Sequence, residues 1–135
     1  LTAEADSEDA AVGTLGAYLY EPDGAVIRAR LIGDLARRLD ARMLDRTIAY
    51  LTSDAAVDTP FASRFAVVAD FSLDQRSLKR ELAARGIGTL EIKKRGVDID
   101  PAAFRTALAL KGDASATLIL TRVAGKRRAI LAERA

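Results

Sequence analysis

The spacing of apolar residues along the chain predicts three helices. In the first, Leu31, Leu35 and Leu39 recur at intervals that place them on one helical face. Asp23 before this helix and Asp100 before the third can act as caps, because a carboxylate accepts hydrogen bonds from the free N–H groups of a first turn. The predicted helices cover residues 25–39, residues 74–85 and a segment that begins at Pro101.

Short apolar runs with an alternating polar side predict the strands. In the clearest of them, Leu90 and Ile92 point to one side, and Glu91, Lys93 and Arg95 point to the other. The strands are predicted at residues 13–21, around 42–52 as one or two strands, and at 65–71, 88–95, 117–123 and 129–132. The last two are expected to form an antiparallel pair.

The alternation of helices and strands determines the expected fold class. It favours a single α/β domain with a mixed β-sheet covered by about three helices. Residues 1–11 are acidic and lack a basic partner, so they are expected to form a flexible interdomain linker before a domain spanning residues 12–135. The chain starts at Leu1 rather than at a methionine, which agrees with a segment taken from a longer protein.

Composition excludes several classes of site. Half of the 135 residues are apolar, which is enough for one hydrophobic core, but cysteine and histidine are both absent. Disulfides, thiolate nucleophiles and zinc knuckles are therefore excluded, and the most common general base is missing. No catalytic or metal-binding residue is predicted. The chain also lacks a dinucleotide-type glycine-rich loop and a Walker sequence, so no cofactor site is expected in it.

Apolar runs are too short for a membrane-spanning helix, which needs roughly 18 residues, and a secretory signal is not apparent. The sequence therefore predicts a protein of the cytoplasm without membrane association. The absence of cysteine fits that reducing compartment.

The net charge of +2 conceals an uneven distribution. Residues 1–75 carry 7 basic and 13 acidic side chains, whereas residues 76–128 carry 13 basic and 5 acidic ones. Such an imbalance is typical of a positive face that binds nucleic acid. The alternative is that the charges alternate around solvated helices and cancel in space.

The densest cationic segment is Lys93-Lys94-Arg95, at the end of a predicted strand. Cations at a strand end, before the start of a helix, can form a phosphate platform. A solvated edge strand whose lysines discourage aggregation is the alternative. Residues 126–128 form a second cationic cluster, for which a solvated hairpin tip is favoured.

Two further segments contain candidate residues. Glu21 and Asp23 flank a proline shortly before Arg28, and they are expected to cap the helix and orient Arg28 rather than to act as an acid–base pair. Tyr50 can stack on a base, although a tyrosine in an apolar strand is more often a core residue. Asp54 follows the hydroxyl residues at the end of that strand.

Three separated segments in a fixed order carry a resemblance to a known family. Residues 19–29, 48–54 and 90–101, with the strand end at 118–123, resemble the THUMP-like C-terminal domain of bacterial class I S-adenosylmethionine-dependent methyltransferases. The resemblance spans residues 15–132. It implies a THUMP-like fold, a preceding catalytic domain that binds S-adenosylmethionine, and recognition of an RNA substrate such as tRNA or rRNA.

The sequence and the resemblance together favour a non-catalytic accessory domain that recognises RNA through a basic surface. The expected RNA-binding residues are Arg28, Tyr50, Lys93, Lys94 and Arg95. The functional surface is expected to include Glu21, Asp23 and Asp54 as well. The alternative is a structural or oligomerisation domain that packs on the catalytic domain and completes its active site.

Overall fold

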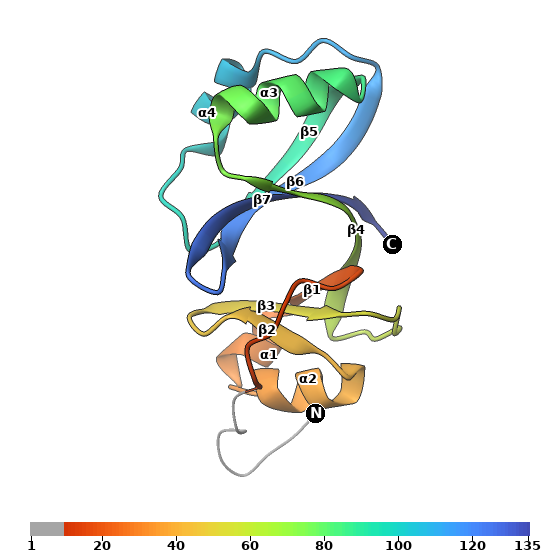
Figure 1. Ribbon diagram of the computed structural model, residues 1–135. Coiled ribbons are helices and arrows are strands. Elements are labelled where there is room, and N and C mark those ends of the chain that lie inside the picture. The colour runs from red at the N-terminus through yellow and green to blue at the C-terminus, as the bar shows by residue number, and fades with distance from the viewer. Residues whose placement is uncertain (1–9) are drawn as a thin grey trace. The chain divides into compact units, whose positions relative to one another are not determined.

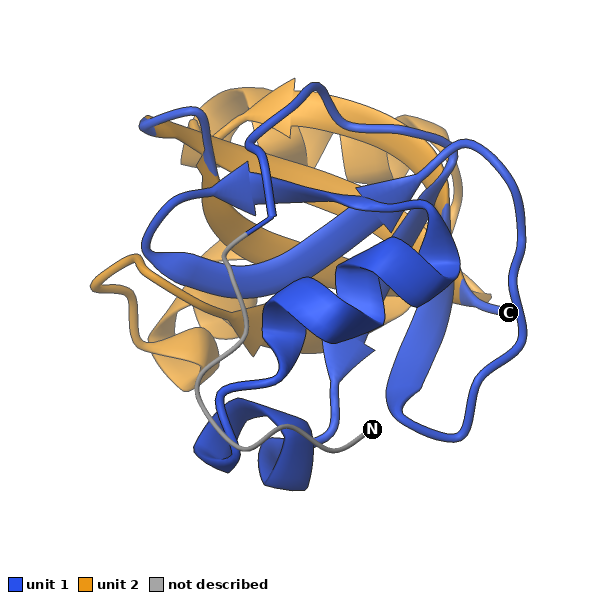
Figure 2. Cartoon of the chain, turned by 90° about the horizontal axis from the view of Figure 1, so that it is seen from below, with its two compact units in different colours: residues 1–66, 123–125, 134–135 blue, residues 67–122, 126–133 orange. Residues whose placement is uncertain are grey.

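The computed structural model describes residues 10–135, which divide into two compact units (Figure 2). The first contains the chain up to Ala66, with Val123–Gly125 and Arg134–Ala135. The second contains Val67–Arg122 and Lys126–Glu133. Most of the predicted linker, residues 1–9, lies outside the described residues. Its last residue, Ala11, accepts a hydrogen bond of 2.9 Å from the N–H of Met43.

Two short helices cover one face of an antiparallel sheet in the first unit (Figure 1). Its elements are β1 (Tyr18–Pro22), α1 (Gly24–Arg28), α2 (Ile32–Leu39), β2 (Arg42–Asp45), β3 (Ile48–Ser53) and the first part of β4 (Ala62–Ser72). The strands are hydrogen-bonded in the order β2-β3-β1-β4, and all three neighbouring pairs are antiparallel. The core between these helices and the sheet contains Tyr20, Val26, Leu31, Leu35, Ala36, Leu39, Met43 and Leu51.

The prediction of one continuous helix over residues 25–39 is wrong. The chain leaves α1 after Arg28 and enters α2 at Ile32, and Arg30 between them has a φ of 59° in the left-handed region. The left-handed conformation of Arg30 ends the first helix, because a continuous right-handed helix requires a negative φ at every residue. Val26 and Leu31, on either side of this turn, both pack in the core of the first unit.

The second unit has a mixed sheet with two helices on one face. It contains the second part of β4, α3 (Gln75–Ala84), β5 (Ile87–Lys94), α4 (Pro101–Leu108), β6 (Ala114–Val123) and β7 (Lys126–Arg134), except the last residue of each of the strands β6 and β7. The strand order is β4-β7-β6-β5. Helix α4 connects β5 to β6, which lie side by side in parallel. The buried core contains Leu78, Leu82, Ile87, Leu90, Phe104, Leu108, Leu118, Leu120, Ala129 and Leu131.

The predicted fold class is confirmed. Because β4 belongs in part to each unit, the strands form one seven-stranded mixed sheet, in the order β2-β3-β1-β4-β7-β6-β5. The described residues contain four helices instead of about three, because the helix predicted over 25–39 is two. No helix in residues 10–135 has the length and apolar character needed to cross a membrane.

Three glycines bring two backbone segments into direct contact in the second unit. The N–H of Ala114 donates to the carbonyl of Gly86 at 3.0 Å, where the loop before β6 passes the start of β5. A Cβ atom added to Gly112 would lie 1.9 Å from the carbonyl oxygen of Gly86, and one added to Gly88 would lie 1.7 Å from that of Gly112. Both separations are far below any non-bonded contact, so these two positions require glycine.

Asp45 connects two turns of the first unit. Asp45 is 7% exposed. Its carboxylate accepts one hydrogen bond of 3.0 Å from the N–H of Thr47 and one of 2.9 Å from the Thr47 hydroxyl. It also accepts one from the N–H of Gly125 at 2.8 Å. Ala124 and Gly125 join β6 to β7 and both have positive φ, 50° and 81°, as in a type I′ hairpin turn. Asp45 therefore holds the β6–β7 turn and the β2–β3 turn together.

Asp74 caps α3 and makes its stability dependent on pH. The carboxylate accepts a hydrogen bond from the N–H of Ser77 at 3.0 Å and another from the Ser77 hydroxyl. These two hydrogen bonds lower the pKa of Asp74 below its ordinary value. Because the folded pKa is depressed, the cap stabilises the fold at neutral pH, and this contribution is lost as the pH falls through the folded pKa.

We expect Asp74→Asn to reduce the acid sensitivity of the domain. Asparagine is as good a helix cap as aspartate but does not titrate, so the variant should match the wild type near pH 7. Its free energy of unfolding should then fall less between pH 7 and about pH 3 than that of the wild type. Urea unfolding at both pH values measures this, with the exposed Asp113→Asn as control. Equal losses in all three proteins would contradict the assignment.

Candidate nucleic-acid interface

The carboxyl end of β5 is held firmly against β6. The last residue of β5, Lys94, is paired with Leu120, and the N–H of Arg95 donates to the Leu120 carbonyl at 3.0 Å. The hydroxyl of Thr121 in turn donates to the carbonyl of Arg95 at 2.9 Å. The backbone of Lys94 and Arg95 is thus fixed at the end of the sheet, while both side chains are exposed.

The β6–β7 hairpin brings further cations to the same end of the sheet. Strand β6 continues past Thr121 to Val123, and β7 starts two residues later, at Lys126. Since β7 is the hydrogen-bonded neighbour of β6, the start of β7 lies beside the end of β6. We call these cations, from three adjacent strands, the basic edge: Lys93, Lys94, Arg95, Arg122, Lys126 and Arg127. Lys94, Arg95, Lys126 and Arg127 are its exposed members.

Side-chain alternation at the end of β5 follows the sequence prediction. Glu91 is paired with Thr117 and accepts a hydrogen bond of 3.1 Å from its hydroxyl. Lys93 follows Glu91 by two residues and shares its face. Lys94 lies on the face of Leu90, which packs in the core below α3 and α4. The cations at this strand end therefore project to both faces of the sheet.

Arg128 is not part of this exposed set. Its Nε donates to the carboxylate of Asp70 at 2.9 Å, and its guanidinium reaches the Asp70 carbonyl at 3.4 Å and the Ser72 hydroxyl at 3.5 Å. These contacts attach β7 to its neighbour β4. The charge of Arg128 is thus largely compensated within the sheet.

The candidate carboxylates of the first unit have structural partners. Asp23 accepts a hydrogen bond of 3.2 Å from the N–H of Ala25, so the capping role favoured from the sequence is confirmed. Glu21 accepts a hydrogen bond of 3.4 Å from the Tyr50 hydroxyl.

The other two candidates of this unit are exposed. The carboxylate of Asp54 forms an ion pair of 3.2 Å with Arg42. Arg28 ends α1 with an exposed side chain.

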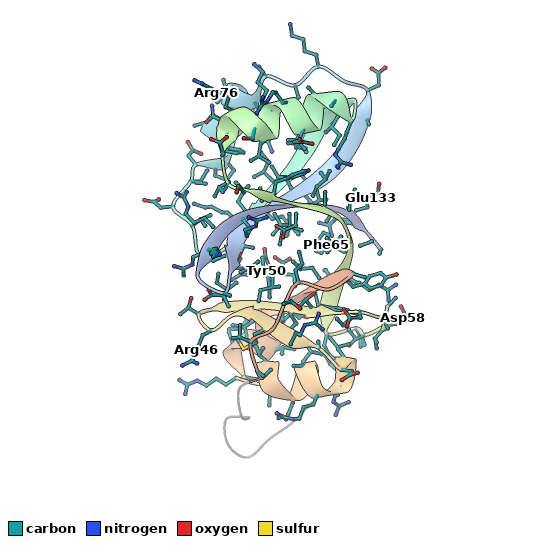
Figure 3. All side chains as sticks on the ribbon, viewed as in Figure 1. Arg46, Tyr50, Asp58, Phe65, Arg76 and Glu133 are labelled. Atoms are coloured by element: carbon teal, nitrogen blue, oxygen red, sulfur yellow. The ribbon has the colours of Figure 1, made fainter. Side chains whose placement is uncertain are left out.

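The stacking role predicted for Tyr50 is incompatible with the structure. Tyr50 is 1% exposed, and it lies on the face of β3 opposite to Leu51, which contacts the helix side of the first unit (Figure 3). A buried ring offers no free face on which a base could stack. Its position between the apolar residues Ile48 and Leu51 was the sequence signal for a core residue.

Sequence reasoning missed the connection between the two cationic clusters. The sequence favours a solvated hairpin tip for residues 126–128 and does not identify Arg122 as a candidate. Lys126 and Arg127 are exposed, as expected for such a tip, and they also share an edge with Lys94 and Arg95. The signal was the strand–helix–strand order at 87–123, because such a unit commonly pairs its strands in parallel and aligns their carboxyl ends. Within residues 10–135, no group of three His, Cys, Asp or Glu side chains is arranged to hold a metal ion.

Comparison with known proteins places these features in a family. The model of the THUMP domain-like family matches residues 62–134, from the first residue of β4 to the last of β7. Two proteins from strains of Mycobacterium tuberculosis, each described as an uncharacterized S-adenosylmethionine-dependent methyltransferase, are 36% identical over 118 residues, or 87% of this chain. The chain spans 32% of the length of each of them.

A solved structure has the same fold. The crystal structure of a Porphyromonas gingivalis W83 protein, described as a methyltransferase, superposes with a TM-score of 0.74. The match covers 95% of this chain and 31% of that protein, at 22% sequence identity. The family match includes the whole basic edge, and the sequence relatives extend the likeness to most of the first unit. The chain therefore belongs to the THUMP domain-like family.

Proposed function

We propose that this domain recognises the RNA substrate of an S-adenosylmethionine-dependent methyltransferase, and that the basic edge contacts the RNA phosphates. The observation that carries the proposal is the convergence of cations from β5, β6 and β7 at one end of the sheet. The name of the Mycobacterium tuberculosis relatives supports the methyltransferase part. S-adenosylmethionine would then be bound by the part of the protein that the relatives have beyond this domain.

The chemistry of the basic edge suits phosphate groups better than bases. Arginine and lysine donors match phosphate oxygens in charge and hydrogen-bonding geometry. Both backbone groups of Arg95, its N–H and its carbonyl, are hydrogen-bonded to β6. The exposed side chains therefore project from a fixed backbone. Such contacts position an RNA without reading its sequence, and they release counterions, which makes binding strongly dependent on salt.

We expect Lys94→Ala/Arg95→Ala to weaken RNA binding and its salt dependence. Each phosphate contact contributes a slope of roughly −0.7 to −0.9 to log K against log salt concentration, so losing two contacts should reduce the slope by roughly 1.5. Fluorescence anisotropy with total tRNA and RNA hairpins, at several salt concentrations, measures both quantities. Circular dichroism checks that the wild type and the variant are both folded under the conditions of the assay.

A matched control carries the same change in charge elsewhere. Arg38→Ala/Lys111→Ala also removes one arginine and one lysine, both exposed, from α2 and from the loop before β6. This variant should bind RNA with nearly the wild-type slope. An equal loss of RNA affinity in both variants would mean that the effect arises from net charge alone. If the wild type does not bind RNA at low salt, the proposed function is rejected.

A further inference from the structure

An open groove of about 490 Å³ lies in the second unit, beside the first turn of α3 and along α4. Its lining combines apolar side chains from α4 and from the residues just before α3 and α4 with three polar side chains. The apolar residues are Leu73, Ile99, Ala103, Phe104 and Ala107, and the polar ones are Gln75, Asp100 and Arg127. We call it the α3–α4 groove.

The α3–α4 groove continues along α3 toward two exposed cations. A second hollow shares Gln75 and Ala107 with it and is lined further by Asp74, Arg76 and Lys79. Arg76 and Lys79 are three positions apart and therefore lie on the same side of α3. Figure 3 shows Arg76 projecting outward from the beginning of this helix.

The groove is also continuous with the basic edge. Arg127 belongs to the basic edge and lines the groove. Ile99 and Asp100, at the end of the loop that leaves β5 after Arg95, line it as well. A chain of cations thus runs from Lys94 and Arg95 through Arg127 to the groove wall on α3.

One carboxylate lines the groove, Asp100, and one lines the second hollow, Asp74. Asp100 accepts a hydrogen bond of 3.1 Å from the N–H of Ala102, and Asp74 accepts one of 3.0 Å from that of Ser77. Both carboxylates cap a helix, so the partial positive charge of the helix start offsets part of their negative charge. The linings of the two hollows also contain three cations, Arg76, Lys79 and Arg127, against these two carboxylates. The groove wall is therefore positive where Arg76, Lys79 and Arg127 project.

We propose that the α3–α4 groove holds a second stretch of the sugar–phosphate backbone of the RNA whose first contact is the basic edge. The inference rests on the proposed function, and it extends the RNA-binding surface beyond the basic edge. The C–H groups of the ribose rings can contact the apolar floor formed by Leu73, Ile99 and Ala103, and the phosphates meet the cations of the rim. Charge complementarity selects the anionic backbone of RNA over an apolar protein segment as the occupant.

The test compares Arg76→Ala/Lys79→Ala with the same Arg38→Ala/Lys111→Ala control. The expected result is a salt slope reduced by about one for each cation removed, and weaker binding that does not depend on RNA sequence. Alanine is the best helix former, so α3 is expected to remain intact, which circular dichroism verifies. The probe is a series of RNA hairpins of increasing stem length.

Stem length separates this inference from the proposed function. A short hairpin that covers only the basic edge should bind the groove variant and the wild type equally, and the difference should appear only with longer stems. If the groove variant binds every hairpin like the wild type while Lys94→Ala/Arg95→Ala weakens binding, the groove proposal is overturned and the function stands. If the wild type binds none of them, both fail.

Discussion

Substitution of Gly112 by alanine should lower the free energy of unfolding by about 3 kcal/mol, the upper end of the cost of overpacking. The added Cβ atom would lie 1.9 Å from the carbonyl oxygen of Gly86 and 2.9 Å from the carbonyl carbon of Ile87. The colliding atoms belong to the backbone, so no side chain can rotate away. Relief requires separating the loop before β6 from the start of β5, which breaks the hydrogen bond from Ala114 to Gly86.

Gly86→Ala is the matched control for this prediction. A Cβ atom at Gly86 meets nothing within 4 Å, but the residue has a φ of 71°. Its cost is therefore limited to the backbone strain of a left-handed alanine, about 1–2 kcal/mol. Urea unfolding of the three proteins gives the comparison. A Gly112→Ala variant as stable as Gly86→Ala would show that the two segments do not touch.

Asp45→Ala should cost about 2–3 kcal/mol of unfolding free energy, since it removes a mostly buried carboxylate that accepts three hydrogen bonds. The N–H of Gly125 would lose its acceptor in a turn that already holds Ala124 at a positive φ. We therefore expect loosening of the β6–β7 turn as well as of the β2–β3 turn. Hydrogen exchange at the amides of Thr47 and Gly125 should become faster in this variant.

Asp58→Ala is the control for Asp45→Ala, because it removes an exposed carboxylate instead of a buried one. Asp58 forms a salt bridge of 2.8 Å with Arg64, but its side chain is 96% exposed. Exposed pairs of this kind contribute up to about 1 kcal/mol. A loss of stability in Asp45→Ala no larger than in Asp58→Ala, with unchanged exchange at Gly125, would mean that Asp45 does not organise the two turns.

Local signals in the sequence were sufficient for most elements. The caps at Asp23 and Asp100 and the proline at the first position of α4 were predicted, because each depends on residues within one turn of chain. The alternation along β5 was likewise predictable from neighbouring residues. The fold class followed from the order of these elements.

Features that depend on distant residues were not predictable from the pattern. The break at Arg30 was hidden because Ile27, Leu31, Leu35 and Leu39 are spaced four residues apart, as in one helix. The basic edge depends on the pairing of β5 with β6, which are separated in sequence by α4. The strand–helix–strand order at 87–123 is a signal for this pairing, but the residues next to each cationic cluster do not record it.

The division of β4 has a practical consequence for work with fragments of this chain. Its residues up to Ala66 pair with β1 in the first unit, whereas those from Val67 on belong to the second unit. A fragment starting at Val67 would cut a strand in its middle, and neither unit corresponds to one uninterrupted piece of sequence. Expression boundaries are therefore better placed ahead of β1 than within or just before β4, where they would separate β1 from its paired strand.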